Sequence, residues 1–67
     1  MTAVEAKVHW SPEKKKWQVV IQVGAEVIKR WANQPKEAAE DSLRSAAIAT
    51  AKDEGYDLDA GHVAVER

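Results

Sequence analysis

Three consecutive lysines, Lys14, Lys15 and Lys16, lie in a turn-like stretch that leads directly into Trp17. Amide and cationic side chains follow in the next two strand-like segments: Gln18, Gln22, Lys29 and Arg30. Lysine binds phosphates, glutamine and arginine read base edges, and β-ribbons enter the major groove. These residues form a candidate nucleic-acid-binding set. The alternative is a solvated lysine loop that discourages pairing between sheet edges.

Val20 and Trp31 form a second candidate site, of a different chemical kind. If the strand register places Trp31 on the outer face of the sheet, Trp31 lies beside Val20. An exposed aromatic ring next to a β-branched side chain is a platform for a protein partner. A buried Trp31 would remove this patch.

The chain offers little for catalysis or metal binding. His9 and His62 are the only histidines, cysteine is absent, and a closed metal site needs three or four ligands. The run Asp57-Leu58-Asp59-Ala60-Gly61 has a superficial likeness to the start of a calcium loop, but the chain ends before the bidentate glutamate that such a loop requires. No phosphate-binding loop, activated nucleophile or small-molecule pocket is evident. We therefore expect a non-enzymatic protein without a cofactor or metal.

Two segments predict an antiparallel hairpin. Apolar residues alternate with polar ones over Val4–Trp10 and again over Lys16–Val23, which is the period of a half-buried strand. When the chain is folded on the Ser11–Lys16 loop, Trp10 faces Trp17 and the apolar sets coincide. This agreement fixes the register, because a slip of one residue would expose a whole set.

The third strand, over Glu26–Ala32, is compatible with two registers. A two-residue loop at Gly24-Ala25, with glycine at the positive φ of a type II′ turn, places Val27, Lys29 and Trp31 on the outer face. A three-residue loop with a bulge instead buries Val27 and Trp31 and turns Ile28 and Arg30 outward. We favour the second register, because burying a tryptophan removes much apolar surface from water.

The remaining segment predicts a helix and a short strand. Pro35 is suited to a first helical turn, acidic residues follow, and Gly55 is placed to cap a helix that ends near Glu54. The helix carries a stripe of small residues at helical spacing: Ala39, Leu43, Ala46, Ala47, Thr50 and Ala51, with Ile48 at its margin. Alternation over His62–Arg67 predicts a fourth strand at an edge.

Length and charge bound the function. Sixty-seven residues make a single domain over 1–67. Up to Lys36 the chain has seven basic and three acidic residues, and after it three basic and eight acidic, so the halves carry about +4 and −5. Such asymmetry is typical of an interaction face, and also arises without function in small domains. No apolar run approaches a membrane span, and we expect a cytoplasmic protein.

Two resemblances follow from WQVVIQ, EVIKRW and PKEAAE in this order. The chain resembles several small uncharacterised bacterial families of β-β-β-α-β plan. Up to about Ala51 it also resembles the AP2-like, arm-type DNA-binding domains of phage integrases, with Lys36-Glu37-Ala38 near the start of the helix. The first resemblance implies the fold, and the second implies nucleic-acid binding.

We therefore expect an α+β domain: a three-stranded antiparallel β-meander packed by one α-helix, with a short C-terminal fourth strand. The favoured function is a protein-interaction or self-associating module, because the near-zero net charge gives no long-range attraction to DNA. The alternative is a nucleic-acid-binding module that uses the basic outer face and the Lys14–Lys16 loop. The expected partner is thus another protein or a second copy, or else nucleic acid, with no membrane and no small-molecule substrate.

Overall fold

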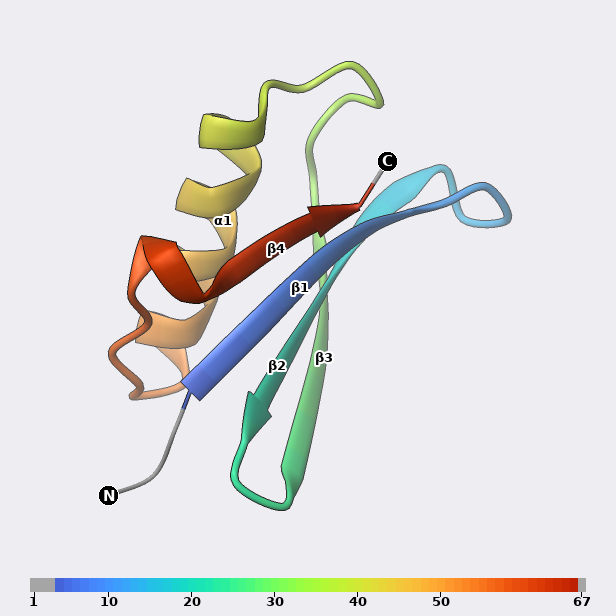
Figure 1. Ribbon diagram of the computed structural model, residues 1–67. Coiled ribbons are helices and arrows are strands. Elements are labelled where there is room, and N and C mark those ends of the chain that lie inside the picture. Colours follow the sequence, from blue (N-terminus) through green and yellow to red (C-terminus); the bar gives the residue numbers. More distant parts are fainter. Residues whose placement is uncertain (1–3, 67) are drawn as a thin grey trace.

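The computed structural model describes residues 4–66. One helix lies against one face of a four-stranded sheet whose strand order is β3-β2-β1-β4 (Figure 1). Neighbouring strands are antiparallel except β1 and β4, which are parallel. The elements in chain order are β1 Val4–Ser11, β2 Lys16–Val23, β3 Glu26–Ala32, α1 Glu40–Asp53, a single 3-10 turn η1 Ala60–His62, and β4 Val63–Glu66.

The predicted α+β class, the meander and the final edge strand are confirmed. His62 belongs to the 3-10 turn rather than to β4, and Arg67, which the predicted strand included, lies outside the described residues. No helix in the described part of the chain is both long enough and apolar enough to cross a bilayer.

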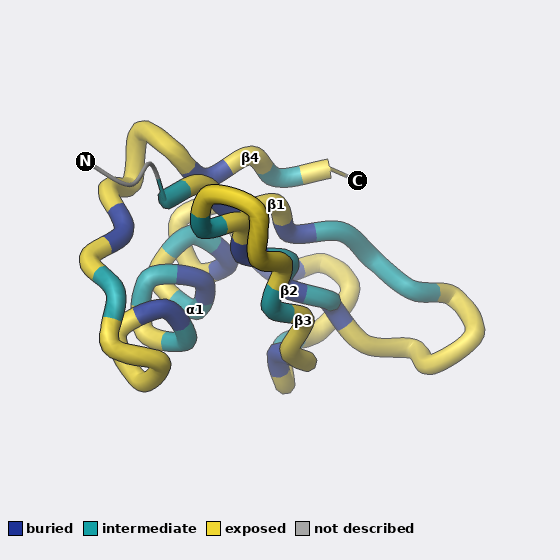
Figure 2. Tube along the Cα trace, turned by 90° about the horizontal axis from the view of Figure 1, so that it is seen from below, coloured by how far each residue is buried: buried dark blue, intermediate teal, exposed yellow. Residues whose placement is uncertain are grey.

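The β1–β2 hairpin has the predicted register, with Trp10 opposite Trp17 and Val8 opposite Val19. Its loop closes through a hydrogen bond of 2.8 Å from the Lys15 amide to the Ser11 carbonyl. Lys15 takes a φ of 54°, in the left-handed region. The loop is exposed and extends away from α1 (Figure 2), so its lysines are available to solvent.

The core lies between the sheet and α1. Leu43, Ala47 and Ala51 face the sheet from α1 and are fully buried, as is Val19 at the centre of β2. The small alanines let the helix axis come close, and the sheet supplies the volume through Trp17, which is 1% exposed. The helix stripe is as predicted except at Ala39, which is exposed and precedes the helix.

The helix begins later than predicted, at Glu40 rather than at Pro35. The Pro35 carbonyl accepts the indole N–H of Trp17 at 2.7 Å and the Ala38 amide at 3.1 Å. A helix from Pro35 would direct this carbonyl to the amide of residue 39 instead. The buried indole needs a hydrogen-bond acceptor, and the turn that supplies it delays the helix.

The helix ends as predicted, at a glycine with positive φ. Gly55 has a φ of 90°. Its amide bonds to the Lys52 carbonyl at 3.0 Å, and the Tyr56 amide bonds to the Ala51 carbonyl at 2.9 Å. These two bonds form a Schellman motif, which satisfies carbonyls that the helix would otherwise leave open.

Gly55 and Gly61 provide a matched test of this ending. A Cβ at either position meets no atom within 4 Å, and only Gly55 has positive φ. We expect Gly55→Ala to lower the free energy of unfolding by about 1–2 kcal/mol, because an L-residue is strained in that conformation. Gly61→Ala is expected to be neutral or slightly stabilising. Urea unfolding of both variants checks this, and equal losses would contradict the backbone argument.

Candidate binding surface on the open face of the sheet

One face of the sheet packs against α1, and no element of the described chain covers the other (Figure 1). We call this second face the open face. Its register rows run across the strands, with Trp31 opposite Gln18 and Gln18 opposite His9. The open face consists of Glu5, Lys7, His9 and Ser11 from β1, Lys16, Gln18, Val20 and Gln22 from β2, Val27, Lys29 and Trp31 from β3, and Ala64 and Glu66 from β4.

The favoured register of β3 was wrong, and Trp31 lies outside the core. Val23 pairs with Glu26, which leaves a two-residue loop in which Gly24 has a φ of 58°. Trp31 is 47% exposed and Val27 54%, the two exposed large hydrophobic residues of the described chain. Val20 is half-buried on the neighbouring strand, diagonal to both. The predicted patch of Val20 and Trp31 is therefore present on the open face.

Arg30 does not belong to the predicted basic face. It lies opposite buried Val19, on the side of the sheet that carries α1. Its Nε donates to Glu54 Oε1 at 2.8 Å, its Nη2 lies 2.8 Å from the same oxygen, and its Nη1 donates to the Lys29 carbonyl at 2.8 Å. The expectation that Arg30 points outward with the nucleic-acid set is corrected, because the two-residue loop reverses its face.

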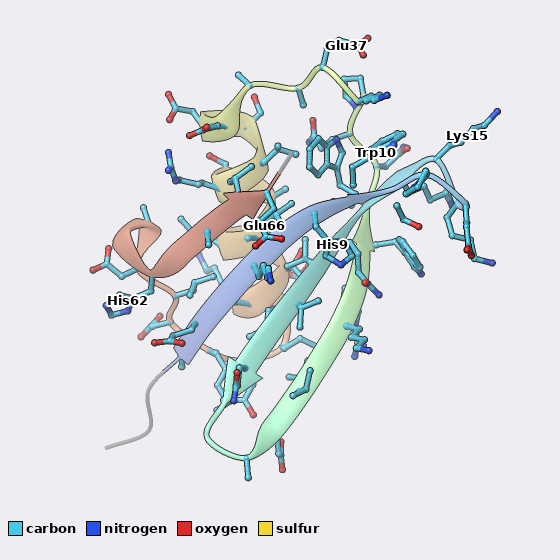
Figure 3. All side chains as sticks on the ribbon, turned by 45° about the vertical axis from the view of Figure 1, so that its right-hand side comes forward. His9, Trp10, Lys15, Glu37, His62 and Glu66 are labelled. Atoms are coloured by element: carbon cyan, nitrogen blue, oxygen red, sulfur yellow. The ribbon has the colours of Figure 1, made fainter. Side chains whose placement is uncertain are left out.

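The other residues of the predicted nucleic-acid-binding set gather only in part. Lys16 and Gln18 lie on the open face next to the loop that carries Lys14 and Lys15, and Lys29 lies farther along the same face. Gln22 shares the face but lies at its other end, opposite Val27. Figure 3 shows Lys15 at the far end of this loop, away from the helix. The row nearest the loop therefore combines an exposed indole with the amide group of Gln18 and with nearby ammonium groups.

Acidic groups are distributed unequally between the two sides. On the helix, Arg44 neutralises Glu40 at 3.4 Å and lies 3.8 Å from Asp41. On the open face, Glu66 pairs with Lys7 at 3.1 Å and Glu5 is the other acid, while Glu13 is the one acid of the adjoining loop. The lysines at the Trp31 end of the face are separated from the helix acids by the thickness of the sheet, so the open face and its loop form the more cationic side.

His9 completes the row of Trp31 and Gln18. Its Nε2 lies 2.8 Å from Gln18 Oε1. An amide oxygen only accepts, so His9 donates through Nε2, and both N–H donors of the Gln18 amide remain on that face. This row can therefore offer an aromatic surface and hydrogen-bond donors to the same ligand. The alternation over Val4–Trp10 predicts His9 on the polar side of its strand, but it does not indicate this contact.

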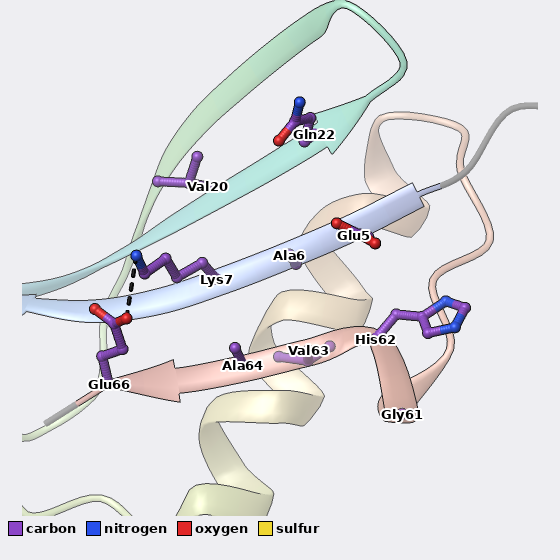
Figure 4. Close-up of a pocket in the computed structure, with 10 residues that line it drawn as sticks. All are labelled: Glu5, Ala6, Lys7, Val20, Gln22, Gly61, His62, Val63, Ala64 and Glu66. Carbon is purple, nitrogen blue, oxygen red and sulfur yellow. Dashed lines mark ion pairs between the residues drawn. The ribbon is translucent and has the colours of Figure 1, made fainter.

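A shallow depression of about 550 Å³ occupies the other end of the open face, between β1 and β4 (Figure 4). Val20 and Ala64 contribute its apolar surface, and the Lys7–Glu66 ion pair lies along its rim. His62 stands at the far end from His9, so the two histidines do not meet. Among residues 4–66 no cluster of three metal-binding side chains occurs. In the run that resembles the start of a calcium loop, the Asp59 side chain accepts the Gly61 amide at 3.4 Å, a turn in which an aspartate bonds to the backbone.

The position of Trp31 can be tested by stability. We expect Trp31→Thr to change the free energy of unfolding by less than about 1 kcal/mol, since surface changes that keep strand propensity cost little. The milder change Trp17→Phe is expected to cost about 1–3 kcal/mol, because the Pro35 carbonyl loses its buried donor. Urea denaturation checks both. A loss of about 3 kcal/mol or more at Trp31 would instead place this residue in the core.

Comparisons with protein-family models, with curated proteins and with solved structures found no match. The two resemblances drawn from the sequence therefore remain expectations.

Proposed function

We propose that this protein is a non-enzymatic protein-interaction module that binds an extended acidic segment of another protein across its open face. The observation that carries this proposal is the joint exposure of Trp31 and Val27 beside Val20. Exposed aromatics that are held rigid by a strand are frequent anchors of binding energy. Because lysines surround this patch, we expect the partner segment to be acidic.

The size of the face favours a peptide rather than a folded partner. Four strands spaced about 4.8 Å apart, read over about six residues of 3.3 Å each, span roughly 400 Å². A stable complex of two folded proteins buries about 800 Å² on each partner. The open face therefore fits a single extended segment, bound weakly and reversibly.

The charge of the face disfavours face-to-face self-association. A second open face offers Lys16 and Lys29 few carboxylates, because its acids are Glu5 and the already paired Glu66. Like charges placed together across an interface are destabilising. The lysines of the face attract an acidic segment, whereas they repel the lysines of a second open face. The charge therefore favours a different protein as the partner on this surface.

A titration followed by amide NMR tests the proposal. The probe is a capped octapeptide with two central phenylalanines and glutamate elsewhere, and the control peptide carries lysine in place of glutamate. We expect amide shifts over residues 16–20 and 27–31 with the acidic probe alone. Trp31→Thr is expected to weaken binding at least about tenfold, the effect of losing an anchor residue. Equal binding of both peptides, or unchanged binding by Trp31→Thr, would refute the proposal.

Single-stranded nucleic acid binding is the second candidate, favoured by the position of the Lys14–Lys16 loop next to the Trp31–Gln18 row. Bases stack on exposed aromatic rings while lysines hold the phosphates. An oligothymidylate in the same titration separates the two functions. Binding of the oligonucleotide that weakens steeply with salt, together with no binding of the acidic peptide, would assign the face to nucleic acid.

A further inference from the structure

β3 is an edge strand of seven residues, and one side of its backbone faces no other strand within residues 4–66. A two-residue loop closes with a hydrogen-bonded pair, here Val23 and Glu26. Because bonded and non-bonded pairs alternate along an antiparallel ladder, Val27, Lys29 and Trp31 direct their N–H and C=O groups toward the open edge. An uncovered edge of this length is a template for another strand.

The guanidinium of Arg30 closes the centre of this edge. Its Nη1 donates to the Lys29 carbonyl at 2.8 Å, so the guanidinium lies against this edge acceptor. Its Nε and Nη2 are held by Glu54 at the end of α1, each 2.8 Å from Oε1. A strand that pairs at Lys29 must first displace this guanidinium. The pair is solvent-exposed, with side-chain exposures of 50% and 31%, so it is weak enough to open.

We propose that the Arg30–Glu54 pair is a latch over an interface for a second copy of this chain, in which two β3 strands pair antiparallel about a two-fold axis at Ile28. Such an axis is perpendicular to the joined sheet, and it keeps opposite residues on the same face. This interface is distinct from the open face used in the proposed function.

Charge complementarity favours a second copy of the chain as the partner, and it favours the register with the axis at Ile28. An axis at Ile28 places Ile28 opposite Ile28 of the second copy, and Glu26 opposite Arg30 of the second copy. Once released from Glu54, each Arg30 therefore finds a new carboxylate across the edge. An axis at Lys29 would instead oppose two lysines, which is destabilising in a cross-strand pair.

Three variants test the latch by sedimentation equilibrium over a wide concentration range. Glu54→Ala frees Arg30 and leaves Glu26 to receive it. We expect its dimer dissociation constant to be about tenfold lower than that of the unmodified chain, because two exposed ion pairs open per dimer. Adding Glu26→Lys should abolish this gain. Glu66→Ala is the matched control, since it breaks an exposed ion pair of the same sheet away from the β3 edge.

Single cysteines test the register, because the chain has none of its own. In the Glu54→Ala background, Ile28→Cys should form an intermolecular disulfide, since Cα atoms of such a non-bonded pair lie about 4.5 Å apart. Lys29→Cys should crosslink far more slowly. The latch is refuted if Glu54→Ala dimerises no better than the unmodified chain or than Glu66→Ala. The register is refuted if Lys29→Cys crosslinks faster. Neither result bears on peptide binding, which is read out separately through Trp31.

Discussion

The two-residue loop at Gly24-Ala25 is the constraint on which the surface of this protein depends. It fixes Val23 opposite Glu26, and every residue of β3 then has its face assigned. Trp31 goes to solvent and Arg30 goes to the helix side. A loop longer by one residue would exchange the two faces of β3 and remove both the exposed patch and the ion pair with Glu54.

Turn chemistry explains why this register prevails over the burial of Trp31. Three-residue hairpin loops usually place their last residue in the left-handed region, which here would be Glu26, at a cost of about 1–2 kcal/mol for a non-glycine residue. Gly24 instead stands first, where a two-residue loop needs positive φ, and its φ is 58°. The interior is also occupied at that level, because buried Trp17 lies opposite Ala32 and packs edge-on against Trp10 at 5.5 Å.

The sequence predicted correctly those parts of the fold for which several local signals indicate the same structure. The β1–β2 register followed from two matching alternations, and the helix end followed from a single glycine placed after an amphipathic run. The helix start could not be predicted, because it depends on the bond between Trp17 and Pro35, which are 18 residues apart. The same limit applies to Arg30 and Glu54, which are 24 residues apart and reveal their pairing only once the register of β3 is known.

The face on which each candidate site residue lies depends on the register of β3. Lys16, Gln18, Gln22 and Lys29 of the predicted nucleic-acid-binding set share the open face, and Val20 and Trp31 lie together on it, as the two-residue loop predicts. Arg30 was predicted on the opposite face of the sheet from the one on which it lies. A choice of register based on the burial of Trp31 alone is therefore wrong, because it leaves out the conformational preference of the turn residues.

The alternation of residues along β3 also distinguishes the open face from the open edge. Val27, Lys29 and Trp31 present their side chains to the open face and, by the alternation of the ladder, their backbone groups to the open edge. A side-chain substitution at any of them alters the open face and leaves the backbone groups of the edge in place. Arg30 has its backbone in the ladder with β2, and only its side chain reaches the edge, at the Lys29 carbonyl. The closure of the edge can therefore be altered through Arg30 and Glu54 while the open face keeps all of its side chains.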